Sequence, residues 1–310
     1  MDQILITTSS FGHHDPGPLE MLTESGYEVR MNPHGRRLTT DESRNMMHRT
    51  VGLLAGTERL SMSVLETAPL LKVISRCGVG LDSIDLGATE VLGIKVLNTT
   101  DAHVDAVAEL TLGGILDVLR HLSRADRRIR RQEWRKPMGQ LLKGKTVGIV
   151  GLGRTGRRLV ELLGPFSGRI LAFDVAVDTD FAAANPVTYG SLETVIEESD
   201  ILTLHLGYSP ETHHLIDAAR IAEMKPGAIL VNAARGGLVD ETALEEALRS
   251  GHLAGAYLDV YEEEPYTGAL TDFDNVLLTP HIGSYAIESR IAMEREAAKN
   301  LLEAMTEIRR

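Results

Sequence analysis

Short apolar runs alternate with amphipathic stretches along almost the whole chain. In the first third, the runs predict strands at residues 4–7 (ILIT), 28–31 (EVRM), 51–55 (VGLLA), 72–75 (KVIS) and 94–97 (IKVL). Segments such as PLEMLTESG and SVLETAP lie between them and have helical spacing. This alternation is typical of a parallel sheet covered by helices, which binds ligands beyond the carboxyl ends of its strands. The loops TSSFGHH (8–14) and RCGVG (76–80) follow predicted strands, so both are candidate site segments.

The rest of the chain continues this pattern after one long interruption. Residues 101–122 predict a single long helix, and the basic stretch 124–140 is either a segment that crosses between two domains or a surface loop. Residues 285–308 again predict a helix. Six further strands are predicted between them, at 146–150, 170–174, 201–206, 228–234, 253–260 and 275–281. Six strands with intervening helices match a doubly wound dinucleotide-binding fold.

Composition narrows the class of protein. A chain of 310 residues is long enough for two domains, and its net charge of −12 argues against a nucleic-acid partner. The single cysteine, Cys77, excludes an internal disulfide and suits a reducing compartment. The amino terminus lacks the features of a signal peptide, and no apolar run approaches the roughly 20 residues of a membrane span. We therefore expect a soluble cytoplasmic protein with no membrane partner.

A glycine-rich loop provides the first chemical signal. Gly151, Gly153 and Gly156 form a G-x-G-x-x-G motif that follows a predicted strand and opens a predicted helix. Glycine there permits a tight turn and lets backbone N–H groups approach a pyrophosphate at the helix amino terminus. Asp174 ends the next strand, where a carboxylate accepts hydrogen bonds from a ribose 2′-OH and repels a 2′-phosphate. Residues 175–177 offer no arginine, so we predict NAD rather than NADP.

Three polar positions follow later strands. Arg235 follows residues 228–234, the run YEEEP (261–265) follows 253–260, and His281 follows 275–279. Together they suit the interconversion of a 2-hydroxy acid and a 2-keto acid. Arginine can clamp the carboxylate, histidine can protonate the carbonyl oxygen as hydride arrives, and glutamate can fix the tautomer and favour imidazolium. Because proline restricts the residue before it, Glu264 suits the fixed role, whereas Glu262 and Glu263 are interpreted as surface residues.

These motifs resemble the D-isomer-specific 2-hydroxyacid dehydrogenase family, and its phosphoglycerate dehydrogenase-like branch in particular. The resemblance rests on SRCGVGLDSIDL, GIVGLGRTG, NAARGGLVDETAL, LDVYEEEP and TPHIGS, and it covers about residues 50–290. It implies an α/β protein with two doubly wound parallel-sheet domains, a flavodoxin-like substrate domain and a Rossmann NAD domain, with a cleft between them. We expect the substrate domain at residues 1–100 and 284–310, and the NAD domain, including a crossing helix, at 101–283. The resemblance also implies a homodimer joined through the NAD domains.

The same resemblance assigns roles to individual positions. It implies that Arg235, Glu264 and His281 are catalytic, and that Arg235 and His281 contact the substrate with Arg76, Gly78, Val79 and Gly80. It implies no metal. The expected cofactor contacts are Gly151, Gly153, Arg154, Thr155, Gly156, Asp174, His205, Ala233, Ala234, Asp259 and Gly283, with Asp259 near the nicotinamide amide.

Departures from the family pattern concern the substrate. The arginine that some relatives use near residue 56 to hold a substrate phosphate is absent, and Arg59 is the nearest base. His103 replaces an asparagine, and Gly207 replaces a proline. The chain is too short for the C-terminal regulatory domain of some phosphoglycerate dehydrogenases, so feedback inhibition through one is not expected. The sequence predicts an NAD-dependent dehydrogenase of a small 2-hydroxy acid, with 3-phosphoglycerate as one candidate. A non-catalytic NAD-sensing interaction protein on the same fold and an enzyme that oxidises a small inorganic anion such as phosphite are the alternatives.

Overall fold

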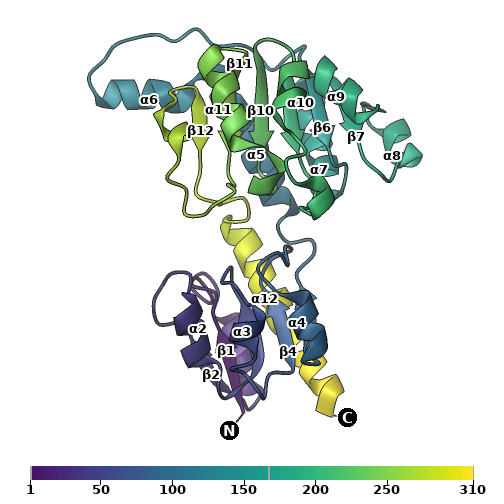
Figure 1. Ribbon diagram of the computed structural model, residues 1–310. Helices are drawn as coiled ribbons and strands as arrows, with labels where there is room; N and C mark the ends of the chain where they lie inside the picture. The colour runs from purple at the N-terminus through teal and green to yellow at the C-terminus, as the bar shows by residue number, and fades with distance from the viewer. Residues whose placement is uncertain (1, 167, 310) are drawn as a thin grey trace. The chain divides into compact units, whose positions relative to one another are not determined.

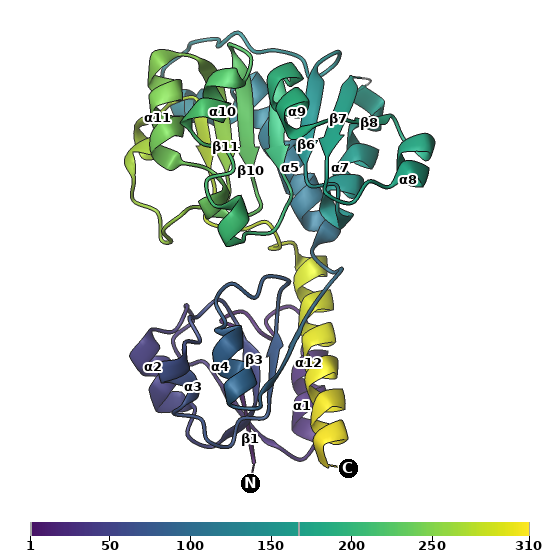
Figure 2. The ribbon, with the colours of Figure 1, turned by 45° about the vertical axis from the view of Figure 1, so that its right-hand side comes forward.

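The structure is a computed structural model that describes residues 2–166 and 168–309. The chain divides into two compact units (Figures 1 and 2). The first unit comprises Met1–His103 with Ser284–Arg310, and the second comprises Val104–Gly283. Each unit is an α/β layer structure built on one parallel sheet, which confirms the predicted fold class.

The first unit holds five parallel strands in the order β2-β1-β3-β4-β5, a doubly wound order. The strands are β1 (Gln3–Ile6), β2 (Glu28–Met31), β3 (Thr50–Ala55), β4 (Val73–Arg76) and β5 (Lys95–Asn98). One apolar core lies between the sheet and helices α1 (Gly17–Glu24) and α12 (Ile287–Arg309). A second core lies beneath α2 (Thr40–Met46), α3 (Met62–Leu65) and α4 (Leu86–Val91). Because helices cover both faces, β1 and β3 are buried at every residue.

The second unit holds seven parallel strands in the order β12-β11-β10-β9-β6-β7-β8. They are β6 (Thr146–Val150), β7 (Arg169–Phe173), β8 (Val187–Tyr189), β9 (Ile201–Leu204), β10 (Ala228–Asn232), β11 (Leu253–Leu258) and β12 (Val276–Leu278). Helices α5 (Val104–Arg120) and α7 (Arg154–Leu163) pack over one face. Helices α9 (Leu192–Glu198), α10 (Ala218–Glu223) and α11 (Glu241–Ser250) cover the other, and α8 (Thr179–Ala184) lies near β8. The order reverses between β6 and β9, which is where such sheets bind dinucleotides.

Two features of the second unit differ from expectation. The sheet has a seventh strand, β8, which has only three residues and is buried only at Val187. The predicted helix 101–122 stops at Arg120, because His121 adopts a left-handed conformation with φ of 56°. A new helix, α6 (Leu122–Arg130), follows and buries none of its residues.

The basic stretch 124–140 therefore does not cross between domains. It lies within the second unit, and the chain passes between the units at 103–104 and 283–284. Residues 131–141, which we call the arm, contain no helix or strand. The arm exposes Trp134 (80% exposed), Met138 (91%) and Leu141 (66%). Within residues 2–166 and 168–309, no helix has the length and apolar character needed to cross a bilayer.

Candidate active site

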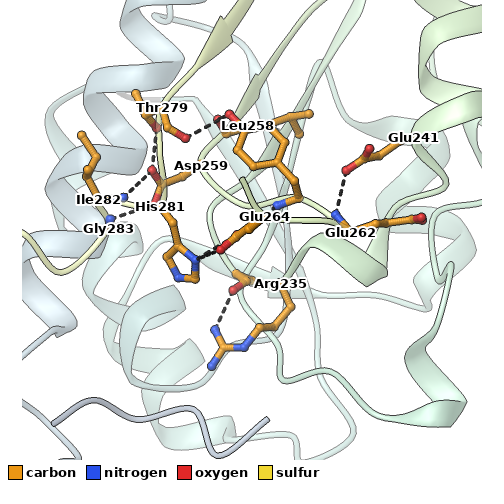
Figure 3. A network of polar contacts seen from close by, with 12 residues as sticks. Arg235, Glu241, Leu258, Asp259, Glu262, Glu264, Thr279, His281, Ile282 and Gly283 are labelled. Atoms are coloured by element: carbon orange, nitrogen blue, oxygen red, sulfur yellow. Dashed lines mark hydrogen bonds and ion pairs between the residues drawn. The ribbon is translucent and has the colours of Figure 1, made fainter. Parts of the chain in front are cut away.

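The three expected catalytic residues follow three neighbouring strands of the second unit. Arg235 lies after β10, Glu264 after β11 and His281 after β12, and these strands are adjacent in the sheet. Figure 3 shows their side chains gathered at this edge of the sheet. The structure therefore groups, within one unit, residues that lie up to 46 positions apart in the sequence.

Glu264 and His281 form a direct pair. Nδ1 of His281 lies 2.9 Å from each of the two carboxylate oxygens of Glu264 (Figure 3). An ionised carboxylate only accepts hydrogen bonds, so this geometry puts a proton on Nδ1 and leaves Nε2 for another partner. The side chains are 44% and 29% exposed, so the pair is accessible to a small molecule. The Glu264–Pro265 peptide is cis.

Arg235 sits in a turn that Asn232 holds. The Asn232 side chain donates to the carbonyl of Arg235 at 2.8 Å and accepts from the N–H of Ala234 at 3.1 Å. The guanidinium of Arg235 donates to the carbonyl of Ala234 at 2.6 Å (Figure 3). Sequence reasoning missed Asn232, although a fully buried amide at the end of an apolar strand is a signal that its hydrogen bonds serve the next turn.

Gly236 allows the turn that carries Arg235 to pack against the loop that carries Glu264. A Cβ atom on Gly236 would lie 1.8 Å from the carbonyl carbon of Tyr261 and 2.4 Å from the backbone nitrogen of Glu262. The Tyr261 ring stacks on Tyr266 at 4.4 Å between centroids. The loop that carries Glu264 is thus packed directly against the turn that carries Arg235.

Glu262 has a partner of its own. Its carboxylate contacts Nε2 of His214, and its backbone N–H donates to Glu241 at 2.8 Å. Burial is the main reason that the pKa of Glu241 is raised. Glu262 and Glu263 are exposed, whereas Glu264 is partly buried and faces His281.

Asp259 is completely buried beneath the turn that carries His281. One carboxylate oxygen accepts from the Thr279 hydroxyl at 2.6 Å and from the Ile282 N–H at 2.8 Å. The other accepts from the Gly283 N–H at 2.7 Å (Figure 3). Burial raises the pKa of Asp259 above its usual value, and these hydrogen bonds oppose the rise. The carboxylate expected near the nicotinamide amide is therefore occupied by three donors from the 279–283 segment.

The glycine loop has the geometry of a phosphate-binding turn. Gly151 has φ of 94°, and a Cβ atom there would lie 2.7 Å from the backbone of His205. A Cβ atom on Gly156 would lie 2.4 Å from the Gly151 carbonyl oxygen, which explains the third glycine. Gly153 caps α7 and is exposed with Arg154, and Thr155 is half-buried beside them. The exposed turn before α7 leaves backbone N–H groups accessible to an anion.

Asp174 lies directly after β7, beside the glycine loop. Its carboxylate accepts from the Leu152 N–H at 2.7 Å and from the Ala176 N–H at 2.9 Å. The neighbouring Val175 and Val177 are 95% and 59% exposed. The residues around Gly151 and Asp174 therefore fit a dinucleotide, with open glycine backbone for the pyrophosphate and a carboxylate for the ribose.

The remaining expected cofactor contacts lie at the same edge of the sheet. His205 follows β9, and its Nε2 atom lies 3.0 Å from the Thr203 hydroxyl. Burial lowers the pKa of His205 to about 4, so the ring is neutral at pH 7. Ala233 and Ala234 follow β10, and Gly283 ends the unit.

The RCGVG segment (76–80), which is expected to contact the substrate, belongs to the first unit and lies at the end of β4. The Arg76 guanidinium donates to the Cys77 carbonyl and would contact a Cβ atom on Gly78 at 2.9 Å, so it folds back over its own loop. Burial raises the pKa of the Cys77 thiol to about 11, which keeps it protonated. The roles of Arg76, Gly78, Val79 and Gly80 toward the substrate stay predictions.

The sequence of the second unit matches a known family model. The model, D-isomer specific 2-hydroxyacid dehydrogenase, NAD binding domain, matches residues 112–283. The chain belongs to this family. A glyoxylate reductase from Thermofilum pendens is 43% identical over 268 residues, which cover 84% of this chain and 79% of the relative. A D-3-phosphoglycerate dehydrogenase from Mycobacterium leprae is 37% identical over 80% of this chain but only 48% of its own length.

Solved structures of this dehydrogenase family extend the likeness to the whole fold. D-lactate dehydrogenase from Aquifex aeolicus, complexed with NAD and lactic acid, has a TM-score of 0.86 at 28% identity, covering 98% of this chain and 95% of that one. The NADPH-dependent glyoxylate/hydroxypyruvate reductase from Sinorhizobium meliloti, in complex with NADP and malonate, has a TM-score of 0.83 at 30% identity, covering 96% and 92%. Residues 112–283 are thus an NAD(P)-binding domain, and the choice between the two cofactors needs a separate argument.

Proposed function

We propose that this protein is a reductase that converts a small 2-keto acid into its D-2-hydroxy acid with a reduced nicotinamide cofactor. The observation that carries the proposal is the Glu264–His281 pair beside Arg235, at the edge of the sheet that also holds the glycine loop. The reduced nicotinamide, when bound, supplies the hydride. Residues of this chain supply orientation and the proton.

His281 is the proton donor in this mechanism. Its Nε2 atom, left unused by Glu264, gives a proton to the carbonyl oxygen as that oxygen gains charge. Glu264 holds the ring through Nδ1 and stabilises the charged imidazole with its carboxylate. Arg235 binds the substrate carboxylate with its planar fork and polarises the carbonyl. The carbon–oxygen double bond is reduced, and the product leaves with one added hydrogen on carbon and one on oxygen.

We infer that the substrate is glyoxylate or hydroxypyruvate rather than a phosphorylated acid. The relative from Thermofilum pendens is named a glyoxylate reductase, and it matches this chain at higher identity and over more of its own length than the phosphoglycerate dehydrogenase does. The stretch AGTERL (55–60) has no arginine at residue 56 for a phosphate, and Glu58 in that stretch is buried. Phosphoglycerate oxidation is therefore the weaker candidate.

The test is oxidation of NADH with a panel of glyoxylate, hydroxypyruvate, pyruvate and 3-phosphohydroxypyruvate. We expect the highest kcat/KM with glyoxylate or hydroxypyruvate, and His281→Ala should abolish turnover while NADH still binds. Preference for the phosphorylated acid would overturn the substrate assignment, and near-normal kcat in His281→Ala would overturn the mechanism.

We propose NAD as the preferred cofactor. Asp174 lies beside the glycine loop, and a carboxylate there repels a 2′-phosphate. The two exposed valines that follow provide no positive charge to offset that repulsion. The ratio of kcat/KM with NADH and NADPH tests this assignment, and equal or better use of NADPH would refute it.

We also propose that the protein forms a homodimer through its NAD(P)-binding domains. The arm exposes an aromatic ring and two long apolar side chains, and α6 before it exposes Ile129. Exposed apolar side chains concentrated on one short segment are typical of an interaction site. Light scattering coupled to size exclusion should give the mass of two chains, whereas a monomer at micromolar concentration would contradict the proposal.

A further inference from the structure

Thr279 lies two residues before His281, and every polar group it has is hydrogen-bonded. Its N–H donates to the carbonyl of Leu258 at 3.0 Å. Its carbonyl accepts from the Tyr261 hydroxyl at 2.9 Å and from the N–H of His281 at 3.0 Å. Its hydroxyl contacts Asp259 and Tyr257 (Figure 3 draws the Asp259 contact). Thr279, which is not one of the three expected catalytic residues, thus joins the end of β11 to the turn that carries His281.

The direction of each hydrogen bond at the Thr279 hydroxyl can be deduced. A threonine hydroxyl has one proton, and Asp259 already accepts from the N–H groups of Ile282 and Gly283. Asp259 therefore acts as an acceptor, and the Thr279 hydroxyl donates to it across 2.6 Å. The Tyr257 hydroxyl, 3.2 Å from the Thr279 oxygen, must then be the donor. Burial raises the pKa of Tyr257, which keeps this phenol protonated.

The chain Tyr257–Thr279–Asp259 starts in the core of the second unit. Tyr257 is fully buried, and its ring lies against Gly114 of α5, where a Cβ atom would be only 2.1 Å from the ring. The phenol has little room to move between the helix and β11. Because the Tyr257 hydroxyl has a fixed position, its hydrogen bond to the Thr279 oxygen restricts the rotamer of the Thr279 side chain.

The backbone of His281 explains why such a fixed point matters. His281 has φ of 54°, a left-handed conformation that is unfavourable for a non-glycine residue. Asp259 holds the turn on both sides of His281, through the hydroxyl of Thr279 before it and the N–H groups of residues 282 and 283 after it. Without its hydroxyl, Thr279 would keep its backbone hydrogen bonds to Leu258 and Tyr261, but Asp259 would no longer link it to residues 282 and 283.

We propose that Thr279 is a positioning residue, whose hydroxyl relays the fixed orientation of Tyr257 through Asp259 to the turn that aims His281. This inference rests on the proposed role of His281 as the proton donor. It assigns Thr279 no contact with substrate or cofactor. Its effect should therefore appear in the rate of proton delivery and not in the binding of either ligand.

The test compares Thr279→Val with Thr279→Ser. Valine keeps the shape and removes the hydroxyl, whereas serine keeps the hydroxyl and removes the methyl group. We expect Thr279→Val to lower kcat for glyoxylate reduction about 10- to 100-fold, because small displacements of a catalytic group have effects of that size. KM for glyoxylate and the Kd for NADH should stay within about threefold of wild type, and Thr279→Ser should recover most of kcat. In ¹⁵N-histidine NMR spectra, Thr279→Val should weaken the signal of the His281 Nδ1–H bonded to Glu264.

Three outcomes would overturn the inference. One is a kcat in Thr279→Val within twofold of wild type while His281→Ala is inactive, which would leave the proposed function standing. Another is equal impairment in Thr279→Ser, which would assign the effect to the methyl group. The third is full activity in His281→Ala, which would remove the proposed function and this inference together. If Thr279→Val does not fold, Tyr257→Phe removes only the donor to Thr279 and should show the same loss of kcat at constant KM; normal kcat in that variant would refute the relay.

Discussion

Gly236→Ala is the sharpest test of how the two catalytic loops are joined. The added methyl group would lie 1.8 Å from the Tyr261 carbonyl carbon, 1.9 Å from its oxygen and 2.4 Å from the Glu262 nitrogen. All three atoms are backbone, so no side-chain rotation can relieve the contact. Reaching an ordinary separation of about 3.4 Å requires the turn and the loop to move apart by about 1.6 Å.

The expected cost follows from that displacement. Overpacking of this kind destabilises a protein by about 1–3 kcal/mol. Arg235 precedes Gly236 directly, and Glu264 follows Tyr261 by three positions, so the separation should also displace the catalytic groups from one another. A misplacement of about 1 Å can reduce the rate about 100-fold, and we expect kcat for glyoxylate to fall by that order.

Gly237→Ala is the matched control. Its methyl group would lie 2.6 Å from the ring of Tyr208, a side chain that is 42% exposed and can swing away. Urea unfolding gives the change in stability, and steady-state reduction of glyoxylate gives kcat. Wild-type kcat and stability in Gly236→Ala would refute the packing argument. Equal loss in Gly237→Ala would show that the turn tolerates no side chain at either position, and that contact with the Tyr261 backbone is not the cause.

Three further predictions address single groups. Glu264→Gln should lower kcat for glyoxylate, because the charged imidazole loses its anionic partner; an unchanged kcat would contradict the pairing in Figure 3. Asp174→Asn should raise the preference for NADPH over NADH by about tenfold, or about 1.4 kcal/mol, measured as the ratio of kcat/KM, and an unchanged ratio would remove Asp174 from cofactor choice. Burial lowers the pKa of His205 to about 4, below the unfolded value of about 6.5, so the unfolded chain binds more protons and the fold loses stability as pH falls between these values. Urea unfolding at a series of pH values measures this fall in the free energy of unfolding. His205→Asn should make the fall smaller by about 1–3 kcal/mol, and an equally steep decline in the variant would contradict the prediction.

Parallel strands were the most predictable part of the fold. The central strands are buried on both faces and appear in the sequence as continuous apolar runs, as β6 does at its predicted bounds (146–150). The edge strand β2 also has its predicted bounds (28–31), although its residues are alternately exposed and half-buried. The strand β8 was not predictable, because its three residues at the sheet edge bury only Val187. The break at His121 was not predictable either, because apolar spacing continues through it and no glycine or proline marks it.

The site shows a similar limit. Strand ends revealed Arg235, Glu264 and His281, because polar residues that follow apolar runs stand out in a parallel-sheet pattern. Tyr257 and Thr279 lie within or beside those runs and are ordinary strand residues, whereas Asn232 is an unusual residue at the end of an apolar strand. Their importance depends on the hydrogen bonds that each oxygen and nitrogen makes, and the spacing of residues in a sequence does not encode these bonds.

The exposed position of Trp134 gives the chain a built-in optical probe. It is the only tryptophan in the sequence, and it lies on the arm, which contains no helix or strand. Under selective excitation, the emission of the protein therefore reports the surroundings of one segment. A shift of that emission to shorter wavelength on raising the protein concentration would record water leaving the indole ring, without any label or substitution.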